Sequence, residues 1–379
     1  MFDYQQHHRY FAQVAGGMEE LGAEELSELG ARSVTSGYRG IYFEADQATL
    51  YRVNYCARLI ARVLAPLLSF QCHSDRYLHQ RAMEIDWPLF FKGDCSFAVS
   101  ANVSQSKIRH SQYAALRLKD AVVDRFRAEH KSRPNIDKIE PDIRFNLYIE
   151  KNRATISLDT SGDALHRRGY RKEAVEAPMQ ETLAAAVIRL STWTGSEPLY
   201  DPMCGSGTLL SEALMQACHI PSGYLREKFG FERLPDFDQN LWRKVKREAG
   251  DKMGPIPSGI ISGSDLSRSA VRAAATNLGA LPYGDHVKLE VASFQKIGHL
   301  EDRVIVCNPP YGIRMGDTDK ATRLYREFGD FLKHRCKGTT AYIYFGNRKT
   351  IGFIGLKPSW KKPFLIGGLD GRLAKFELY

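Results

Sequence analysis

The residues best suited to chemistry follow a short apolar run near the C-terminus. The run Val304–Cys307 ends in Asn308-Pro309-Pro310-Tyr311. Two consecutive prolines donate no hydrogen bonds to a sheet and fix φ, so a strand has to end there. The Asn308 side-chain carbonyl and the Pro309 main-chain carbonyl can each accept a hydrogen bond from one exocyclic amino group, and Tyr311 can stack on a planar base. This loop predicts a site that orients the lone pair of an –NH2 group towards an electrophile.

A glycine-rich turn in EPLYDPMCGSGTLLSEAL is the second candidate site. The pattern indicates a strand, a tight turn and a helix, whose first N–H groups could bind a carboxylate or phosphate. The turn lacks the Lys of a P-loop, and Leu210 stands where a dinucleotide motif has its last glycine. A turn that binds no ligand is the alternative interpretation. The candidate cofactor contacts are Asp201, Pro202, Cys204, Gly205, Ser206, Gly207 and Thr208.

Asp265, followed by Leu266, ends the next apolar run, and an acid in that place accepts hydrogen bonds from ribose hydroxyls. The alternative is a helix cap, but Ser267 can serve as the cap instead. The following strand ends in Ser293-Phe294. Nucleoside sites often have an acid where Ser293 stands, whereas Phe294 can flank an adenine ring.

These sites together predict methyl transfer from S-adenosylmethionine to a planar exocyclic nitrogen. No general base is needed if the proton leaves after the transfer, and positioning would supply most of the rate. Methylation of a pyrimidine carbon would need a thiolate nucleophile. Cys204 and Cys307 lie inside the turn and the strand, where they are expected to pack rather than react.

Composition limits the class of protein. The 379 residues suffice for two or three domains, and no apolar run approaches the ~18 residues that span a bilayer. The seven cysteines form no Cys-x-x-Cys pair and the histidines show no zinc spacing, so no metal is expected. The N-terminus also lacks the layout of a signal peptide. These features predict a cytoplasmic protein with free thiols.

The net charge of +9 and pI of about 9.1 indicate a polyanionic partner. Residues 66–172 carry 19 basic and 13 acidic side chains. A predicted helix near residues 111–131 and the stretch LHRRGYRKEAVEAP are the most basic parts; a solvated helix face and a structural linker are the alternatives. The candidate RNA contacts are Lys107, Arg109, Arg117, Lys119, Arg125, Arg127, Arg167, Arg168, Tyr170 and Arg171.

Two kinds of secondary-structure pattern divide the chain. The N-terminal part predicts α+β units, with helices over 17–30, 46–64 and 111–131, strands over 40–45 and 95–104, and a hairpin that turns at Lys151-Asn152. The C-terminal part alternates strand and helix, which is typical of a Rossmann-like parallel sheet, and closes with an antiparallel hairpin. Its expected strands are 198–201, 259–265, 287–294, 303–308, 339–345, 361–367 and 372–379; its expected helices are 208–217, 267–278 and 320–334, with a further helix, 240–250, in an insertion over 219–258.

The motifs DPMCGSGT, NPPYG and LHRRGYR together resemble the bacterial THUMP-domain guanine-N2 methyltransferases of large-subunit ribosomal RNA. The similarity includes the run SLDTSGDALHRRGYR and the Trp-containing insertion. It implies a ferredoxin-like domain over 1–65, a THUMP RNA-binding domain over 66–163 and a class I methyltransferase domain over 164–379 that begins with a linker, 164–180. Some members carry a second methyltransferase domain, so this chain is similar to the N-terminal half of the fused guanine-N2/N7 enzyme.

The resemblance also implies roles for residues. Asn308, Pro309 and Tyr311 would hold the target guanine, and the helix APMQETLAAAVI, which contains Thr182, would close over the methionine end of the cofactor. Ser293 departs from the family's usual Asp. Rival functions are methylation of guanine in transfer RNA, of adenine-N6 or of a glutamine amide, or RNA binding without catalysis.

Overall fold

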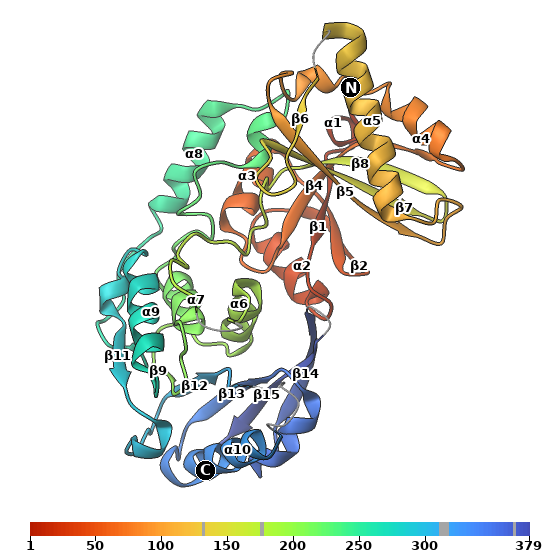
Figure 1. Cartoon of the computed structure of the whole chain (residues 1–379). Coiled ribbons are helices and arrows are strands. Elements are labelled where there is room, and N and C mark those ends of the chain that lie inside the picture. Colours follow the sequence, from red (N-terminus) through yellow and green to blue (C-terminus); the bar gives the residue numbers. More distant parts are fainter. Residues whose placement is uncertain (131–132, 175–177, 311–317, 367–368) are drawn as a thin grey trace. The chain divides into compact units, whose positions relative to one another are not determined.

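The computed structural model describes residues 1–379 except 131–132, 175–177, 311–317 and 367–368 (Figure 1). The described chain divides into two compact units. Unit 1 contains residues 1–14, 23–165 and 226–246, and unit 2 contains residues 15–22, 166–225 and 247–379. Each unit has its own sheet and its own core.

Unit 1 is built on one eight-stranded sheet with the order β2-β3-β1-β4-β8-β7-β5-β6. Most neighbours are antiparallel, whereas β5 runs parallel to β6 and β7. The predicted hairpin is confirmed, because Lys151 and Asn152 have positive φ between β7 and β8. The strands are β1 (Arg9–Gln13), β2 (Arg32–Gly37), β3 (Gly40–Glu44), β4 (Arg62–Gln71), β5 (Ser96–Ser104), β6 (Asn135–Ile136), β7 (Ile143–Glu150) and β8 (Arg153–Asp159).

Helices cover the apolar face of this sheet. In α5, Leu118, Val122 and Phe126 are buried as expected, whereas Ala115 is only half-buried and Ala114 is buried in its place. Phe126 meets Phe91, which also contacts Phe97 and Phe145 of the sheet. The helices are α1 (Asp3–His7), α2 (Glu19–Glu28), α3 (Gln47–Cys56), α4 (Asp75–Ala82), α5 (Ser111–His130) and the 3₁₀ turn η1 (Trp87–Leu89).

The helix expected over 46–64 is wrong in its second half. Helix α3 ends at Cys56, and the apolar run that begins at Arg62 is the central strand β4. Pro66 fits this strand because the β4–β8 register shifts between Pro66 and Leu68, and such an irregularity tolerates the missing N–H. The expected boundary between residues 65 and 66 therefore falls inside one strand.

Part of the expected insertion over 219–258 groups with unit 1, and the rest of it groups with unit 2. Residues 226–246 group with the N-terminal elements. This segment contains η2 (Gly230–Arg233) and the first part of α8 (Gln239–Gly250). Trp242 of α8 meets the rings of Tyr51 and Tyr55 on α3 at 6.1 and 5.2 Å between centroids.

Unit 2 is built on a seven-stranded sheet with the order β11-β10-β9-β12-β13-β15-β14. The first five strands in this order are parallel, and β15 pairs antiparallel with both β13 and β14. The expected Rossmann-like sheet with a terminal antiparallel hairpin is confirmed. The strands are β9 (Leu199–Asp201), β10 (Ile261–Asp265), β11 (Lys288–Val291), β12 (Val304–Cys307), β13 (Thr340–Phe345), β14 (Trp360–Ile366) and β15 (Leu369–Glu377).

Helix α10 packs its aromatic side chains against the centre of this sheet. Tyr325 stacks on Phe345 of β13, and Phe328 belongs to the same buried cluster as Ile305 and Cys307 of β12. This packing fixes β12, and so the loop that follows it. The helices of unit 2 are α6 (Glu181–Leu190), α7 (Thr208–Ala217), α9 (Arg268–Gly279), α10 (Thr318–Arg335) and the 3₁₀ turns η3 (Gly284–His286), η4 (Phe294–Lys296) and η5 (Arg348–Ile354).

Candidate active site

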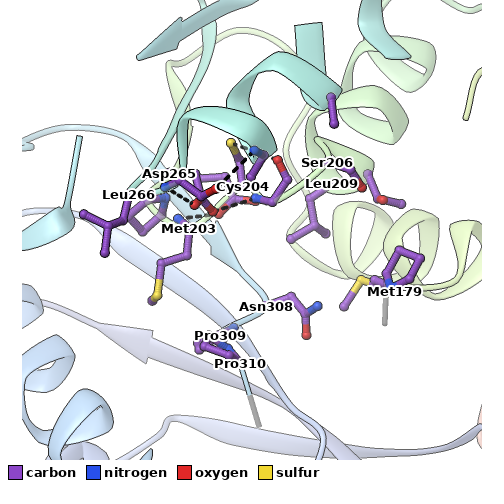
Figure 2. A pocket seen from close by; sticks show the side chains of 18 of the residues that line it. Met179, Met203, Cys204, Ser206, Leu209, Asp265, Leu266, Asn308, Pro309 and Pro310 are labelled. Carbon is purple, nitrogen blue, oxygen red and sulfur yellow. Dashed lines mark hydrogen bonds between the residues drawn. The ribbon is translucent and has the colours of Figure 1, made fainter. Parts of the chain in front are cut away.

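The carboxyl ends of three neighbouring strands in unit 2 bring the predicted chemistry together. Strand β9 lies between β10 and β12, where the strand order reverses, and open α/β sheets bind ligands at such a point. Asp201 ends β9, Asp265 ends β10 and Asn308 follows β12. All three line one cavity of about 1000 Å³. Figure 2 shows Asn308, Pro309 and Pro310 across this cavity from Asp265 and Leu266.

The glycine turn is held by the Asp265 carboxylate. Its Oδ2 accepts a hydrogen bond from the Gly205 N–H at 2.9 Å, and its Oδ1 accepts one from the Ser267 N–H at 2.9 Å. Ser267 caps α9 by accepting from the Ala270 N–H, as the sequence suggested. Asp265 is thus already bonded to the main chain, but each carboxylate oxygen retains a lone pair for a ribose hydroxyl.

Asp201 has a different environment, because its side chain is only 1% exposed. Burial raises the pKa of this carboxyl to about 8, and the hydrogen bond from the Met203 N–H opposes that rise. The protonated form of Asp201 is therefore favoured near neutral pH. The Cys204 and Cys307 thiols are buried nearby, and burial raises the pKa of both, which agrees with packing rather than nucleophilic roles.

Most of the predicted cofactor residues line the cavity; Gly207 and Thr182 do not. Gly207 has φ of +79°, and a Cβ there would lie 3.0 Å from that of Ala274, so it lets α7 pack closely on α9. Thr182 is buried within α6. Those that line the cavity are Asp201, Pro202, Cys204, Gly205, Ser206, Thr208, Asp265, Leu266, Ser293, Phe294 and Asn308.

The loop after β12, which the sequence predicted to bind an amine, is only partly described. Asn308 is half-buried, Pro309 is buried and Pro310 is exposed, and all three line the cavity. Tyr311, which was expected to stack on the target base, lies outside the described residues. The two prolines and the asparagine are therefore placed as the sequence predicted.

The part of the cavity around Ser293 and Phe294, predicted to contact adenine, contains a residue that sequence reasoning missed. Gln295 lines the cavity, accepts a hydrogen bond from the Ser293 hydroxyl and donates one to Glu327 at 2.9 Å. The Ser293 oxygen keeps lone pairs, so it can accept from an amino group where an Asp is usual. Leu266, 76% exposed, and the buried Phe294 offer apolar surface for a planar ring.

The stretch read as a linker forms one wall of the cavity. Glu173, Ala174, Pro178 and Met179 line it. Asn277 of α9 fixes this wall: its Oδ1 accepts from the N–H groups of Lys172 and Glu173 at 2.8 and 2.9 Å, and its Nδ2 donates to the Ser206 carbonyl at 3.0 Å. A lone Asn on the apolar side of a predicted helix was the available signal for this role.

Two of the predicted RNA contacts in this stretch are wrong. Arg168 and Tyr170 are each 1% exposed, and both donate to Glu212 of α7, at 3.4 and 3.1 Å. A buried charge needs a partner, and here the guanidinium and the carboxylate satisfy each other. These side chains anchor the stretch to α7 and present no surface to RNA, whereas Arg167 is exposed.

Arg171 also points to the cofactor side of unit 2. Its guanidinium donates to Glu181 at 3.0 Å, to the Met179 carbonyl at 2.8 Å and to the Thr208 hydroxyl at 3.2 Å. Met179 and Thr208 both line the cavity. Arg171 therefore joins the wall to the first residue of α7.

The cations of α5 are largely neutralised within unit 1. Arg117 lies 3.7 Å from Asp75 and 3.8 Å from Asp120. The other pairs are Lys119–Asp120, Arg125–Glu129 and Arg127–Asp124, at 2.6, 2.6 and 3.8 Å. Lys107 and Arg109, which precede the helix, are exposed.

Comparisons with known proteins match three successive parts of the chain to family models. Residues 168–375 match the RMKL-like methyltransferase domain, residues 75–159 match the THUMP domain, and residues 9–64 match the RlmL ferredoxin-like domain. The chain belongs to the RMKL-like methyltransferase family. The family resemblance drawn from the motifs is thereby confirmed.

Two relatives illustrate the family. A Synechocystis protein, named as a proposed RNA methyltransferase, is 38% identical over 98% of this chain and 97% of its own length. The ribosomal RNA large subunit methyltransferase K/L of Photobacterium profundum is 36% identical over 96% of this chain. The chain spans 52% of that protein's length, and about half of the other K/L relatives.

Solved structures share the fold over the whole chain. SMU.472, a proposed methyltransferase solved with S-adenosylhomocysteine (SAH), is 28% identical with a TM-score of 0.86, over 98% of both chains. A Listeria monocytogenes protein, described as a predicted N6-adenine-specific DNA methylase, is 26% identical with a TM-score of 0.85, over 98% of this chain and 96% of its own.

The protein is a methyltransferase that uses S-adenosylmethionine. The cavity fits this cofactor by its own chemistry: a glycine turn at a helix start, a carboxylate with free lone pairs and apolar surface beside it. Among the described residues no group of three His, Cys, Asp or Glu could hold a metal ion. No helix within the described ranges is long and apolar enough to cross a membrane.

We predict that Asp265→Ala weakens S-adenosylmethionine binding by roughly 1.5–3 kcal/mol, because the ribose loses a charge-assisted acceptor. Isothermal titration calorimetry measures the change. Ser267→Ala is the matched control, since it removes the cap of α9 and leaves the carboxylate in place. An equal loss in both variants would mean that the helix start, not the ribose contact, controls affinity.

We predict that Arg171→Ala lowers cofactor affinity by about tenfold, because roughly 1–2 kcal/mol of hydrogen bonding no longer holds Met179 and Thr208. Arg171→Lys should restore part of the affinity, and the exposed Arg167→Ala should leave it unchanged. SAH titration and RNA-binding assays are run on the same three variants. A loss of RNA affinity with unchanged SAH affinity would reinstate Arg171 as an RNA contact.

Proposed function

We propose that this protein methylates the exocyclic N2 of a guanine in RNA, and that large-subunit ribosomal RNA is the substrate. The observation that carries the proposal is the position of Asn308 and Pro309 at the end of β12, in the same cavity as Asp265 and the glycine turn. Figure 2 shows Asn308 and Pro309 across the cavity from Asp265, so an amine held by this loop would face the predicted cofactor residues.

The loop supplies two acceptors for one amino group. The Asn308 side-chain carbonyl and the Pro309 main-chain carbonyl each accept one N–H of the guanine 2-amino group, which leaves the nitrogen lone pair directed at the methyl donor. The cofactor, when bound, supplies an electrophilic methyl group. Pro310 fixes φ after Pro309 and so limits movement of that carbonyl. Holding two reactants in this way lowers the barrier, because the entropy of bringing them together is lost at the binding step.

The proton leaves the nitrogen after the methyl group arrives. A transferred methyl makes the nitrogen strongly acidic, so the proton passes to water. Asp201 is buried behind the turn and favours its protonated form near neutral pH, so it is not assigned as the base. The chemistry assigned to this chain is therefore positioning rather than proton abstraction.

The choice of substrate rests on the relatives and on the charge. The K/L relatives are named for large-subunit ribosomal RNA, and this chain aligns with about half of their length. The matched THUMP domain and the net charge of +9 both suit an RNA partner. A cytoplasmic location, where ribosomal RNA and the cofactor meet, is part of the proposal.

Adenine-N6 methylation is the second candidate. The Listeria structure is described as a predicted N6-adenine-specific DNA methylase. Adenine also presents a planar exocyclic amine, so the two carbonyl acceptors do not by themselves distinguish the two bases. Transfer-RNA guanine is a third substrate with the same chemistry, and only the product separates these cases.

The decisive experiment identifies the methylated nucleoside. Deproteinised large-subunit ribosomal RNA, transfer RNA and single-stranded DNA are each incubated with the protein and labelled S-adenosylmethionine, then digested and analysed by mass spectrometry. We expect N2-methylguanosine, formed fastest in ribosomal RNA. N6-methyladenosine as the main product would overturn the proposal in favour of the second candidate.

We predict that Asn308→Ala lowers methyl transfer by about a hundredfold or more and leaves cofactor affinity mostly intact, because the amine loses one of its two acceptors. Single-turnover kinetics and SAH titration separate the two effects. Asn308→Asp, which keeps an acceptor oxygen, should retain more activity than the alanine variant. Turnover close to wild type in Asn308→Ala would refute the assigned role.

A further inference from the structure

The insertion helix α8 presents a basic surface. Its twelve residues contain four cations and one acid, Glu248. The four cations are all exposed: Arg243, Lys244, Lys246 and Arg247, called here the α8 basic face. No ion pair is described for Arg243 or Arg247 in the part of the chain that the structure covers.

This surface has a rigid base. Trp242 and Val245, on the other side of α8, are 4% and 2% exposed. The Trp242 ring lies 5.0 Å from the centroid of Phe231 and 5.5 Å from that of Phe229 within the insertion, and it also contacts Tyr51 and Tyr55 of α3. The helix is thus fixed to the ferredoxin-like part by aromatic packing.

The start of α8 is fixed as well. The Asp238 carboxylate accepts from the N–H groups of Asn240 and Leu241 at 2.8 and 3.1 Å, and the Tyr51 hydroxyl accepts from the Asp238 N–H at 3.0 Å. The Tyr4 hydroxyl donates to Asp236 at 2.6 Å. Because the backbone of α8 is already fixed, only the side chains of its cations lose conformational freedom when they bind a ligand.

The contrast with α5 decides which basic helix suits a polyanion. Each of the four cations of α5 lies within 4 Å of an acid, and that helix carries three acids of its own. On α8, Arg243 and Arg247 are four residues apart and so lie on one side, away from Val245. A phosphate backbone that meets α8 releases its counterions, whereas on α5 the cations would first have to leave their acids.

We propose that the α8 basic face contacts the phosphate backbone of the RNA substrate. The inference rests on the proposed function, because it takes RNA as the substrate, and it names the surface that recognises it. Lys246 also lies 4.8 Å from the centroid of Trp242, so its ammonium is held over the anchoring ring at the edge of this surface. The contacts are sequence-independent, so they strengthen binding without selecting the target base.

The test compares two matched double variants. Arg243→Ala/Arg247→Ala removes two cations from α8, and Arg125→Ala/Arg127→Ala removes two from α5 with the same change in net charge. Affinity for deproteinised large-subunit ribosomal RNA is measured over a series of KCl concentrations, together with SAH affinity by calorimetry and helicity by circular dichroism. Arg243→Gln/Arg247→Gln repeats the α8 change with longer polar side chains, should the alanine variant lose structure.

We expect a shallower slope of log affinity against log salt concentration in the α8 variants. The slope should change by up to about 0.9 per lost phosphate contact on a duplex and by about 0.7 on a single strand. The α5 variant should follow the wild-type line, and SAH affinity should be unchanged in all of them. An α8 line that coincides with wild type overturns the inference. Equal flattening by both pairs also overturns it, because net charge rather than a local contact would then be responsible.

The same data separate this inference from the proposed function. If wild-type protein forms N2-methylguanosine in ribosomal RNA and the α8 variants bind RNA like wild type, only the α8 assignment fails. If wild-type protein neither binds nor methylates RNA, the proposed function fails and the α8 assignment fails with it.

Discussion

The Asp265 carboxylate is the interaction on which the cofactor side of the site depends. It joins the Gly205 N–H of the turn after β9 to the Ser267 N–H at the start of α9, so one side chain fixes the ends of two neighbouring strands. An amide or hydroxyl in its place could satisfy one N–H but could not carry the charge that both donors and a ribose favour. The turn is therefore held by hydrogen bonds within the protein, which limits the cost of ordering it on binding. The position of Asn308 depends on the same arrangement, because Asn308 follows β12 and β12 pairs with β9.

A second constraint comes from inside unit 2, where the stretch before α6 is pinned to the sheet domain. Arg168 and Tyr170 reach Glu212, and Asn277 bonds the main chain of Lys172 and Glu173. Removing one partner of a buried ion pair typically costs about 3–5 kcal/mol, because the other charge is left without compensation. The basic residues of this stretch are thus an internal structure of the methyltransferase unit. They set the position of Met179, and so the wall of the cavity, without touching the chemistry.

Sequence reasoning was most successful where the pattern is local. Three features depend on residues close together in the chain, and each was placed correctly: the strand–turn–helix around Gly205, the alternation from Ile143 to Leu158 and the Asn308-Pro309-Pro310 loop.

Sequence reasoning failed where tertiary contacts decide the structure. The apolar run after Cys56 fits a helix as well as a strand, and only pairing with β1 and β8 makes it β4. The aromatic residues of the insertion suit any core, and nothing in their spacing says that the core is that of unit 1. Arg168 looks like a surface cation because its partner, Glu212, is 44 residues away.

The two basic helices show how charge in a sequence differs from charge on a surface. Around α5 the sequence has eight cations and three acids, which suggested an RNA-binding face, yet the acids stand three or four residues from the arginines and pair with them. That spacing was visible in the sequence and argues for a solvated, self-compensated helix. In α8 the only acid is Glu248, four residues after Lys244, and Asp251, four residues after Arg247, lies beyond the end of the helix. No ion pair is found for Arg243 or Arg247 among the described residues. Because the potential that a polyanion meets depends on uncompensated charge, a short helix with one acid can attract RNA more strongly than a longer helix with more cations. On the proposal made for α8, recognition of the backbone belongs to this helix, while the cavity of unit 2 holds the cofactor and one amino group.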